Sequence, residues 1–243
     1  MSCGSIFNGH HQEENVGKSM TRKNMDNNLM FNDGVSVSGE ICGYAYVDLG
    51  LKSGLKWATC NVGASKPTEF GDYFAWGETC PKNDYSWKTY KWCLDDHKTQ
   101  TKYCTLRKYG DVDNKAVLDE EDDVATVKWG KEWRMPSIGE LTELYKNCIW
   151  EFVQDFSGSG VAGLFGTSKK NKQTIFFPAA GYRCLTHFGK VGEYCYIWSS
   201  SLDKKYPDGG YSLGFWELGG NLKGDYRLYG QSVRAVVRPN MFF

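Results

Sequence analysis

The sequence predicts an α+β domain built around an antiparallel sheet and preceded by an N-terminal tail. Three observations support this: a strand, turn and strand pattern that begins at Tyr44, a well-capped helix that begins after Pro136, and strand candidates between residues 174 and 238. Strands first, helices in the middle and a run of strands at the end are typical of α+β proteins. A chain of 243 residues is long enough to bury a sizeable core.

Residues 1–40 are expected to form a mobile tail. They are rich in Asn, Gly, Ser, Lys and Met and show no sustained period of 2 or 3.6. The pattern changes at Tyr44, where apolar and polar residues alternate through Asp48, followed by a turn at 52–54 and a second strand at 55–60. We therefore expect one folded domain over residues 41–243.

The central part of the chain contains a long loop and a short helix. Residues 61–109 hold many aromatic side chains between glycines and prolines, which either pack on the core or are exposed for binding; packing is favoured. The acidic run 119–123 precedes the apolar residues 124–127. Acids at a helix start offset the positive end of its dipole. Calcium is the alternative, but the run lacks the alternating Asp or Asn and the Gly of an EF-hand loop.

The clearest helix begins at Ser137, which has capping-box spacing to Glu140. Apolar residues at 138, 141, 144, 145 and 148 form one stripe, and the helix should end between 147 and 150. Strand candidates follow at 174–178, 192–200, 211–218 and 232–238, each bounded by turn residues. These strands complete the predicted antiparallel sheet.

Charge and hydropathy exclude several classes of protein. The 29 basic and 29 acidic residues cancel, so a general nucleic-acid binder is not expected. There is no apolar stretch of transmembrane length, and residues 1–31 lack the apolar core of a secretory signal. Cys3, followed by Gly and Ser, would suit a lipid-bearing first residue if a signal peptide had preceded it.

The nine cysteines are scattered without a C-x-x-C pair or a Cys/His cluster, so no metal and no cofactor are predicted. They are either small buried hydrophobic residues or, in an oxidising compartment, partners in one or two disulfides. Cys60 and Cys148 are the favoured pair, because Cys60 ends an early strand and Cys148 ends the main helix, which should pack on that strand.

Several sequence blocks, taken together, are characteristic of one family. They read YVDLGLKSGLKWATCNVGA (46–64), GDYFAWGET (71–79), DDVATV (122–127), WRMPS (133–137), FPAAGYR (177–183), WSSS (198–201) and SVRAV (232–236). In this order they resemble the Fibrobacter succinogenes major paralogous domain family, a branch of the C-type-lectin-like superfamily. The resemblance covers about residues 44–238.

The resemblance implies a C-type-lectin-like fold with one main helix, a second short helix, long loops and both termini in one sheet. Family members are commonly secreted or surface lipoproteins, which implies an extracellular or cell-surface location. The superfamily also includes formylglycine-generating enzymes and receptors diversified by retroelements. A fold of this kind hosts many functions, so the function has to be argued from the residues.

An enzymatic function would require a catalytic constellation, and none is complete. Formylglycine-generating relatives use a closely spaced cysteine pair to bind copper; here the candidates are Cys184 and Cys195, without the Arg- and Gly-rich setting of that motif. Ser199 to Ser201 have no nameable base or orienting acid, and in the family this segment is a structural strand end. A thiol and copper oxidase and a purely structural surface domain remain the alternatives to a binding function.

Residues 202–231 have the composition of a recognition surface, with Tyr, Trp, Arg and Asn between glycines. In the retroelement-diversified relatives, the matching stretch is varied to change ligand. The candidate ligand-binding residues are Tyr206, Tyr211, Trp216, Asn221, Tyr226, Arg227 and Tyr229. Part of the stretch should instead alternate into the core. We expect a non-enzymatic module that binds a glycan or a protein on a surface, with Trp216, Tyr226, Arg227 and Tyr229 exposed.

Overall fold

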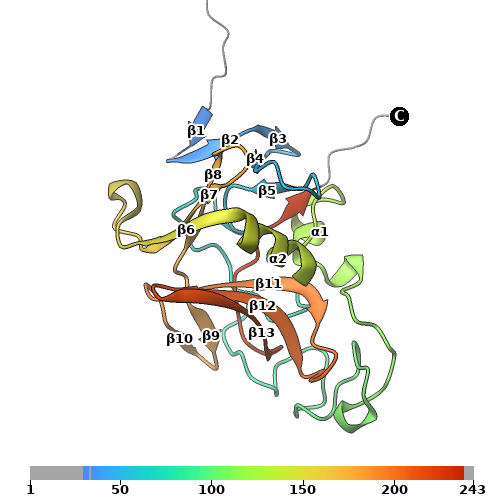
Figure 1. The fold of residues 1–243 in the computed structure, drawn as a ribbon. Coiled ribbons are helices and arrows are strands. Elements are labelled where there is room, and N and C mark those ends of the chain that lie inside the picture. Colours follow the sequence, from blue (N-terminus) through green and yellow to red (C-terminus); the bar gives the residue numbers. More distant parts are fainter. Residues whose placement is uncertain (1–29, 33, 238–243) are drawn as a thin grey trace, which may run out of the picture.

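The computed structural model describes residues 30–32 and 34–237 and consists mostly of antiparallel strands in several small sheets, with two α-helices among these residues (Figure 1). This is an α+β or mainly-β arrangement. The helix α2 lies between the early strands and the later sheet β11–β13, and its apolar side faces a shared core. No helix in the described part of the chain is long and apolar enough to cross a membrane.

The last described strand lies in one sheet with three strands from the early part of the chain, in the order β14-β5-β4-β3. The predicted hairpin is confirmed: β4 (Tyr44–Asp48) and β5 (Lys56–Ala58) are antiparallel, as are β3 (Gly39–Ile41) and β14 (Val236–Val237) with their neighbours. Alternation places Val47, Trp57 and Val236 on the buried side, where they join the main core.

The predicted tail boundary at residue 40 is wrong. β1 (Met30–Asn32) and β2 (Val35–Val37) form a hairpin, and β3 begins before residue 40. Val35 is 1% exposed and packs with Phe156 and Phe176. The Ser36 amide donates to the Thr174 hydroxyl at 3.0 Å. Three-residue strands in polar surroundings are too short to give a periodic signal, and long-range packing orders them. Residues 1–29 of the predicted tail lie outside the described residues.

Both predicted helices are present. Asp123 caps α1 (Val124–Trp129), accepting hydrogen bonds from the amides of Ala125 and Thr126 at 3.0 and 3.1 Å. This confirms that the acidic run marks a helix start. α2 (Ile138–Asn147) begins with the predicted capping box between Ser137 and Glu140.

Two three-stranded sheets follow α2. One contains β6 (Cys148–Val153), β7 (Gly163–Ser168) and β8 (Thr174–Pro178); the other contains β11 (Cys195–Leu202), β12 (Gly209–Trp216) and β13 (Gly219–Tyr226). A hairpin of β9 (Tyr182–Cys184) and β10 (His187–Gly189) lies between them in sequence. The strands β6, β7, β9, β10 and β13 were not predicted. β13 is glycine-rich and has low strand propensity, and it forms because it pairs with β12 along its whole length.

The long aromatic segment before α1 packs down onto the core, as predicted. Trp76, Tyr85 and Tyr103 are buried, and the Trp76 indole donates to the Ser199 carbonyl at 2.8 Å. The predicted disulfide is not formed: Cys60 and Cys148 are both buried free thiols. The two thiols have different surroundings: the Cys60 thiol donates to the Ala64 carbonyl at 3.4 Å, whereas Cys148 lies in the main core with Leu141 and Leu144.

Candidate functional site

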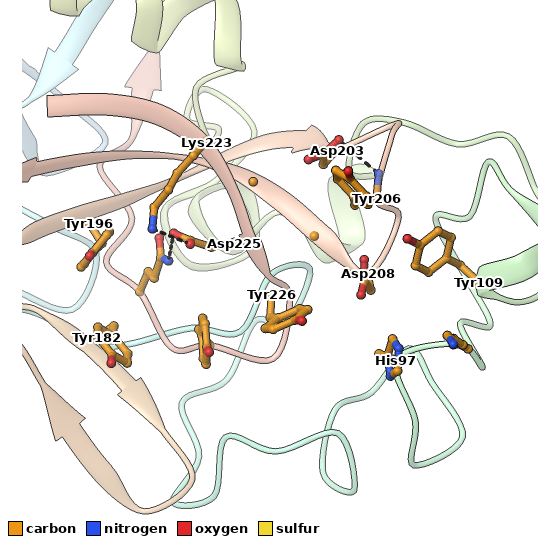
Figure 2. Close-up of a pocket in the computed structure, with 15 residues that line it drawn as sticks. His97, Tyr109, Tyr182, Tyr196, Asp203, Tyr206, Asp208, Lys223, Asp225 and Tyr226 are labelled. Atoms are coloured by element: carbon orange, nitrogen blue, oxygen red, sulfur yellow. Dashed lines mark hydrogen bonds and ion pairs between the residues drawn. The ribbon is translucent and has the colours of Figure 1, made fainter.

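A cavity of about 640 Å³ opens beside β12 and β13 (Figure 2). Its walls come from the segments after β11 and β13, from the loop around His97 and from β9. Ten of its fifteen lining residues lie between 202 and 231, the segment predicted to form the recognition surface. Six of the lining residues are tyrosines: Tyr109, Tyr182, Tyr196, Tyr206, Tyr226 and Tyr229.

The pairing of β12 with β13 positions the floor of the cavity. Gly209 lies opposite Tyr226, and Gly210 lies opposite Asp225, so the end of β13 faces the turn after β11. Gly224 permits this close approach, because a Cβ at that position would collide with the Asp203 carboxylate. The glycines of this segment therefore bring backbone and carboxylates together.

The structure brings three of the seven predicted binding residues into the cavity wall. Tyr206 and Tyr226 are 48% and 49% exposed, and Tyr229 is half-buried. Trp216 is half-buried and Asn221 is exposed, and both lie away from the cavity lining. Tyr211 is also outside the lining; burial, with the charge of Asp203, raises its pKa.

The predicted exposure of Arg227 is wrong, because this residue is 0% exposed. Its guanidinium donates to the Tyr90 hydroxyl at 2.8 Å and to the carbonyls of Lys102, Tyr103 and Pro207 at 3.0, 3.1 and 2.8 Å. β13 ends at Tyr226, and the chain then directs the next side chain inward. Arg227 therefore does not contact solvent but joins three segments that support the cavity walls.

An unbroken series of aromatic contacts connects three of the predicted residues, Trp216, Tyr229 and Tyr226. Trp216 stacks on Tyr194, Tyr194 on Tyr196, and Tyr196 meets Tyr182, with ring centroids 5.6, 5.6 and 5.8 Å apart. Tyr182 then contacts Tyr229 at 5.4 Å, and Tyr229 contacts Tyr226 at 5.9 Å. Trp216 is thus linked to the cavity through its neighbours. Sequence reasoning missed Tyr182 and Tyr196, because they lie on β9 and β11.

The hydroxyl groups of the cavity tyrosines are free. In residues 34–237, none of the six makes a hydrogen bond within the chain. By contrast, the hydroxyls of the buried Tyr73, Tyr85 and Tyr90 each donate to a backbone carbonyl at 2.6–2.7 Å. Tyrosines that serve the core have satisfied hydroxyls, so unsatisfied hydroxyls around a cavity are available to a ligand.

The charged groups of the cavity differ in how they are satisfied. Asp225 pairs with Lys223 at 3.0 Å and accepts hydrogen bonds from Ser212 and Gln231, each at 2.9 Å. Because the Gln231 side-chain nitrogen donates to Asp225, the other end of the Gln231 amide is its oxygen. This oxygen is buried and has no hydrogen-bond partner among the described residues. Burial raises the pKa of Asp208.

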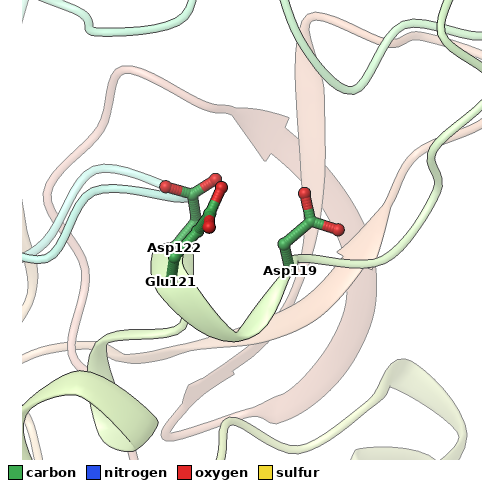
Figure 3. Close-up of side chains that lie close together, drawn as sticks. All are labelled: Asp119, Glu121 and Asp122. Carbon is green, nitrogen blue, oxygen red and sulfur yellow. The ribbon is translucent and has the colours of Figure 1, made fainter.

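An acidic cluster beside η2 (Glu120–Asp122) is neutralised from within the chain (Figure 3). Asp119, Glu121 and Asp122 bring carboxylate oxygens within 4.8 Å of one another. The Lys102 ammonium lies 2.8, 3.2 and 2.6 Å from these three carboxylates, and the Tyr103 hydroxyl donates to Asp122 at 2.6 Å. An ammonium group therefore already occupies the position that a calcium ion would need.

The cysteines and serines that sequence analysis weighed as catalytic groups have structural environments. Cys195 is fully buried, its thiol donates to the Phe177 carbonyl at 3.2 Å, and burial raises its pKa to about 12. Burial and the charge of Asp84 raise the pKa of Cys184. The charge of Arg234 lowers the pKa of Cys195, but the effect of burial is larger, so neither sulfur has the depressed pKa of a reactive thiolate. The Ser199 hydroxyl donates to the Tyr211 carbonyl at 2.7 Å, as expected for a strand-end residue.

Comparison with known proteins does not identify this chain: no family model, no curated protein and no solved structure matches it. The resemblance to the Fibrobacter succinogenes major paralogous domain family therefore stays a prediction. Functional conclusions rest on the residues and geometry of the cavity.

Proposed function

We propose that this chain is a non-enzymatic binding module of the C-type-lectin-like type that recognises a glycan through the cavity formed by residues 202–231 and their neighbours. The observation that carries the proposal is the set of six cavity tyrosines whose hydroxyls make no hydrogen bond within residues 34–237. The module would act in adhesion or capture at a cell surface or outside the cell. Retroelement-driven variation of the same segment would alter its specificity.

A glycan fits the chemistry of this cavity better than a protein does. A sugar ring has an apolar C–H face and a rim of hydroxyl groups, so tyrosine rings can pack on the face while their hydroxyls bond the rim. The volume of about 640 Å³ lies within the ~300–1,000 Å³ that small-molecule sites usually have. A protein partner would instead need a broad surface of about 800 Å² on each side.

The C-type-lectin-like assignment is supported by the sheet that contains β3, β4, β5 and β14. In this sheet the last described strand lies beside an early strand, as the family resemblance implies. The motif blocks fall on elements that build the frame: Trp57, Trp76, Trp133 and Trp198 are all buried. These features support a family-type frame that presents a variable C-terminal face.

A binding role is also better supported than thiol and copper oxidation. Such an oxidase requires two accessible thiolates, and burial raises the pKa of both Cys184 and Cys195. Binding requires no ionised thiol. The cavity, with its free tyrosine hydroxyls, therefore supports binding, whereas the two buried thiols do not support oxidation.

A glycan array with the purified full chain tests the proposal. We expect retention of a small set of oligosaccharides, and Tyr226→Ala should weaken binding about 10-fold or more, since aromatic anchors contribute ~1–4 kcal/mol. Phe188→Ala is the matched control, because Phe188 is an exposed aromatic outside the cavity lining. Failure to retain any glycan above background, or equal losses in both variants, would contradict the proposal.

A further inference from the structure

One carboxylate in the cavity differs from the others in its surroundings. Asp208 is 6% exposed and lines the cavity, yet within residues 34–237 its side chain receives no hydrogen bond from another residue and joins no ion pair. Asp203 is equally buried, but it accepts hydrogen bonds from the amides of Lys205 and Tyr206 at 2.9 and 3.3 Å. Among the described residues, only the amide of Asp208 itself donates to this carboxylate, so its oxygens keep acceptor positions that a group bound in the cavity can use.

Two free hydroxyl groups lie at the same end of the cavity. Figure 2 shows Tyr109 and Tyr206 beside Asp208, with His97 below them. Burial raises the pKa of Tyr109, and the negative charges of Asp208 and Asp203 raise it further. This agrees with the position of Tyr109 near both carboxylates. Asp208, Tyr109 and Tyr206 therefore offer a carboxylate and two hydroxyls to one bound group.

The charges around this end indicate the charge of that group. Asp203 would repel an anion, as would Asp208 itself. The buried Arg227, together with Lys98, would oppose a cation, and His97 and Arg227 already lower the pKa of Asp208 against the larger effect of burial. Charges of both signs thus cancel here, and an uncharged hydrogen-bond donor is favoured over either ion.

We infer that Asp208, with the hydroxyls of Tyr109 and Tyr206, forms a subsite that binds two adjacent hydroxyl groups of an uncharged sugar ring directly, without a bridging calcium ion. The inference rests on the proposed glycan-binding function and assigns its ligand class. The two carboxylate oxygens accept one hydrogen bond from each sugar hydroxyl, and the tyrosine hydroxyls bond the ring's other oxygens. The sugar face lies against the tyrosine rings toward Tyr226.

The test uses an array of neutral, amino and uronic-acid oligosaccharides of equal length, with and without EDTA. The full chain is compared with Asp208→Asn, which removes the charge but keeps the shape, and with Tyr109→Phe, which removes one hydroxyl. We expect neutral sugars to be retained in EDTA, with about 10-fold or greater weakening in Asp208→Asn, because hydrogen bonds to charged groups are the stronger ones. Tyr109→Phe should weaken binding several-fold.

Asp111→Asn is the matched control, since Asp111 is an exposed acid outside the cavity lining, and it should bind like the unaltered chain. If Asp208→Asn and Tyr109→Phe leave the binding of neutral sugars unchanged, or if EDTA abolishes that binding, the proposed subsite is overturned. The proposed glycan-binding function would still stand in either case. Preferential retention of amino or acidic sugars overturns the charge assignment in the same way. Retention of no oligosaccharide by the unaltered chain overturns both proposals.

Discussion

Arg227→Ala should destabilise the fold severely, although Arg227 lies next to one of the most exposed residues of the cavity. Its guanidinium makes four hydrogen bonds, to the Tyr90 hydroxyl and to three backbone carbonyls. It also stacks over the rings of Trp76 and Tyr90, with 5.1 Å to each centroid. Alanine would leave these acceptors without donors and would open a cavity between three chain segments.

The magnitude follows from the groups that lose their partners. A buried polar group left unsatisfied costs ~1–3 kcal/mol. Four such groups at the lower end of that range amount to about 4 kcal/mol, a large share of the ~5–15 kcal/mol that stabilises a typical protein. Arg227→Lys should fall between the wild type and the alanine variant, because an ammonium has only three donors and lacks the planar fork.

Urea denaturation followed by tryptophan fluorescence measures the effect. With an m-value of about 2–3 kcal/mol/M, Arg227→Ala should lower the midpoint by roughly 1–2 M. Tyr226→Ala is the matched control: Tyr226 is 49% exposed, so its free energy of unfolding should change by less than about 1 kcal/mol. An Arg227→Ala midpoint equal to that of Tyr226→Ala would refute the structural role of Arg227.

Three further predictions test other parts of the structure. Hydrogen bonds from Lys102 and Lys115 lower the pKa of Asp119 to about 2, so the stabilisation that Asp119 contributes is present above about pH 4 and disappears as the pH falls through 2. The difference in free energy of unfolding between wild type and Asp119→Asn should therefore shrink as the pH falls over that range. A difference that stays constant would contradict this role of Asp119. Burial raises the pKa of Cys195 to about 12, so this thiol should resist iodoacetamide in the native protein while the exposed Cys42 is alkylated. Peptide mass spectrometry measures the labelling of each cysteine, and equal labelling would mean that Cys195 is accessible. Val35→Ala should cost about 2 kcal/mol in the same urea assay, whereas a change below about 0.5 kcal/mol would place Val35 in a tail after all.

Sequence patterns identified the features that depend on neighbouring residues. The capping box at Ser137, the Asp123 cap and the β4–β5 hairpin involve residues a few positions apart, so their hydrogen bonds follow from local spacing. The strand β8 was predicted at its observed limits, because its apolar run is bounded by clear turn residues. The composition of residues 202–231 also indicated the segment that supplies most of the cavity lining.

Only the tertiary structure decided which side chains of that segment face a ligand. Tyr226 and Arg227 are consecutive and both typical of binding surfaces, but one is exposed and the other is buried because the backbone turns inward after β13. Tyr109 and Tyr182 reach the cavity from elements far away in sequence, and no local pattern reports such contacts. The amino-acid sequence alone determined the local elements and the composition of the recognition segment, whereas burial and the convergence of distant tyrosines depend on long-range packing that spacing along the chain does not encode.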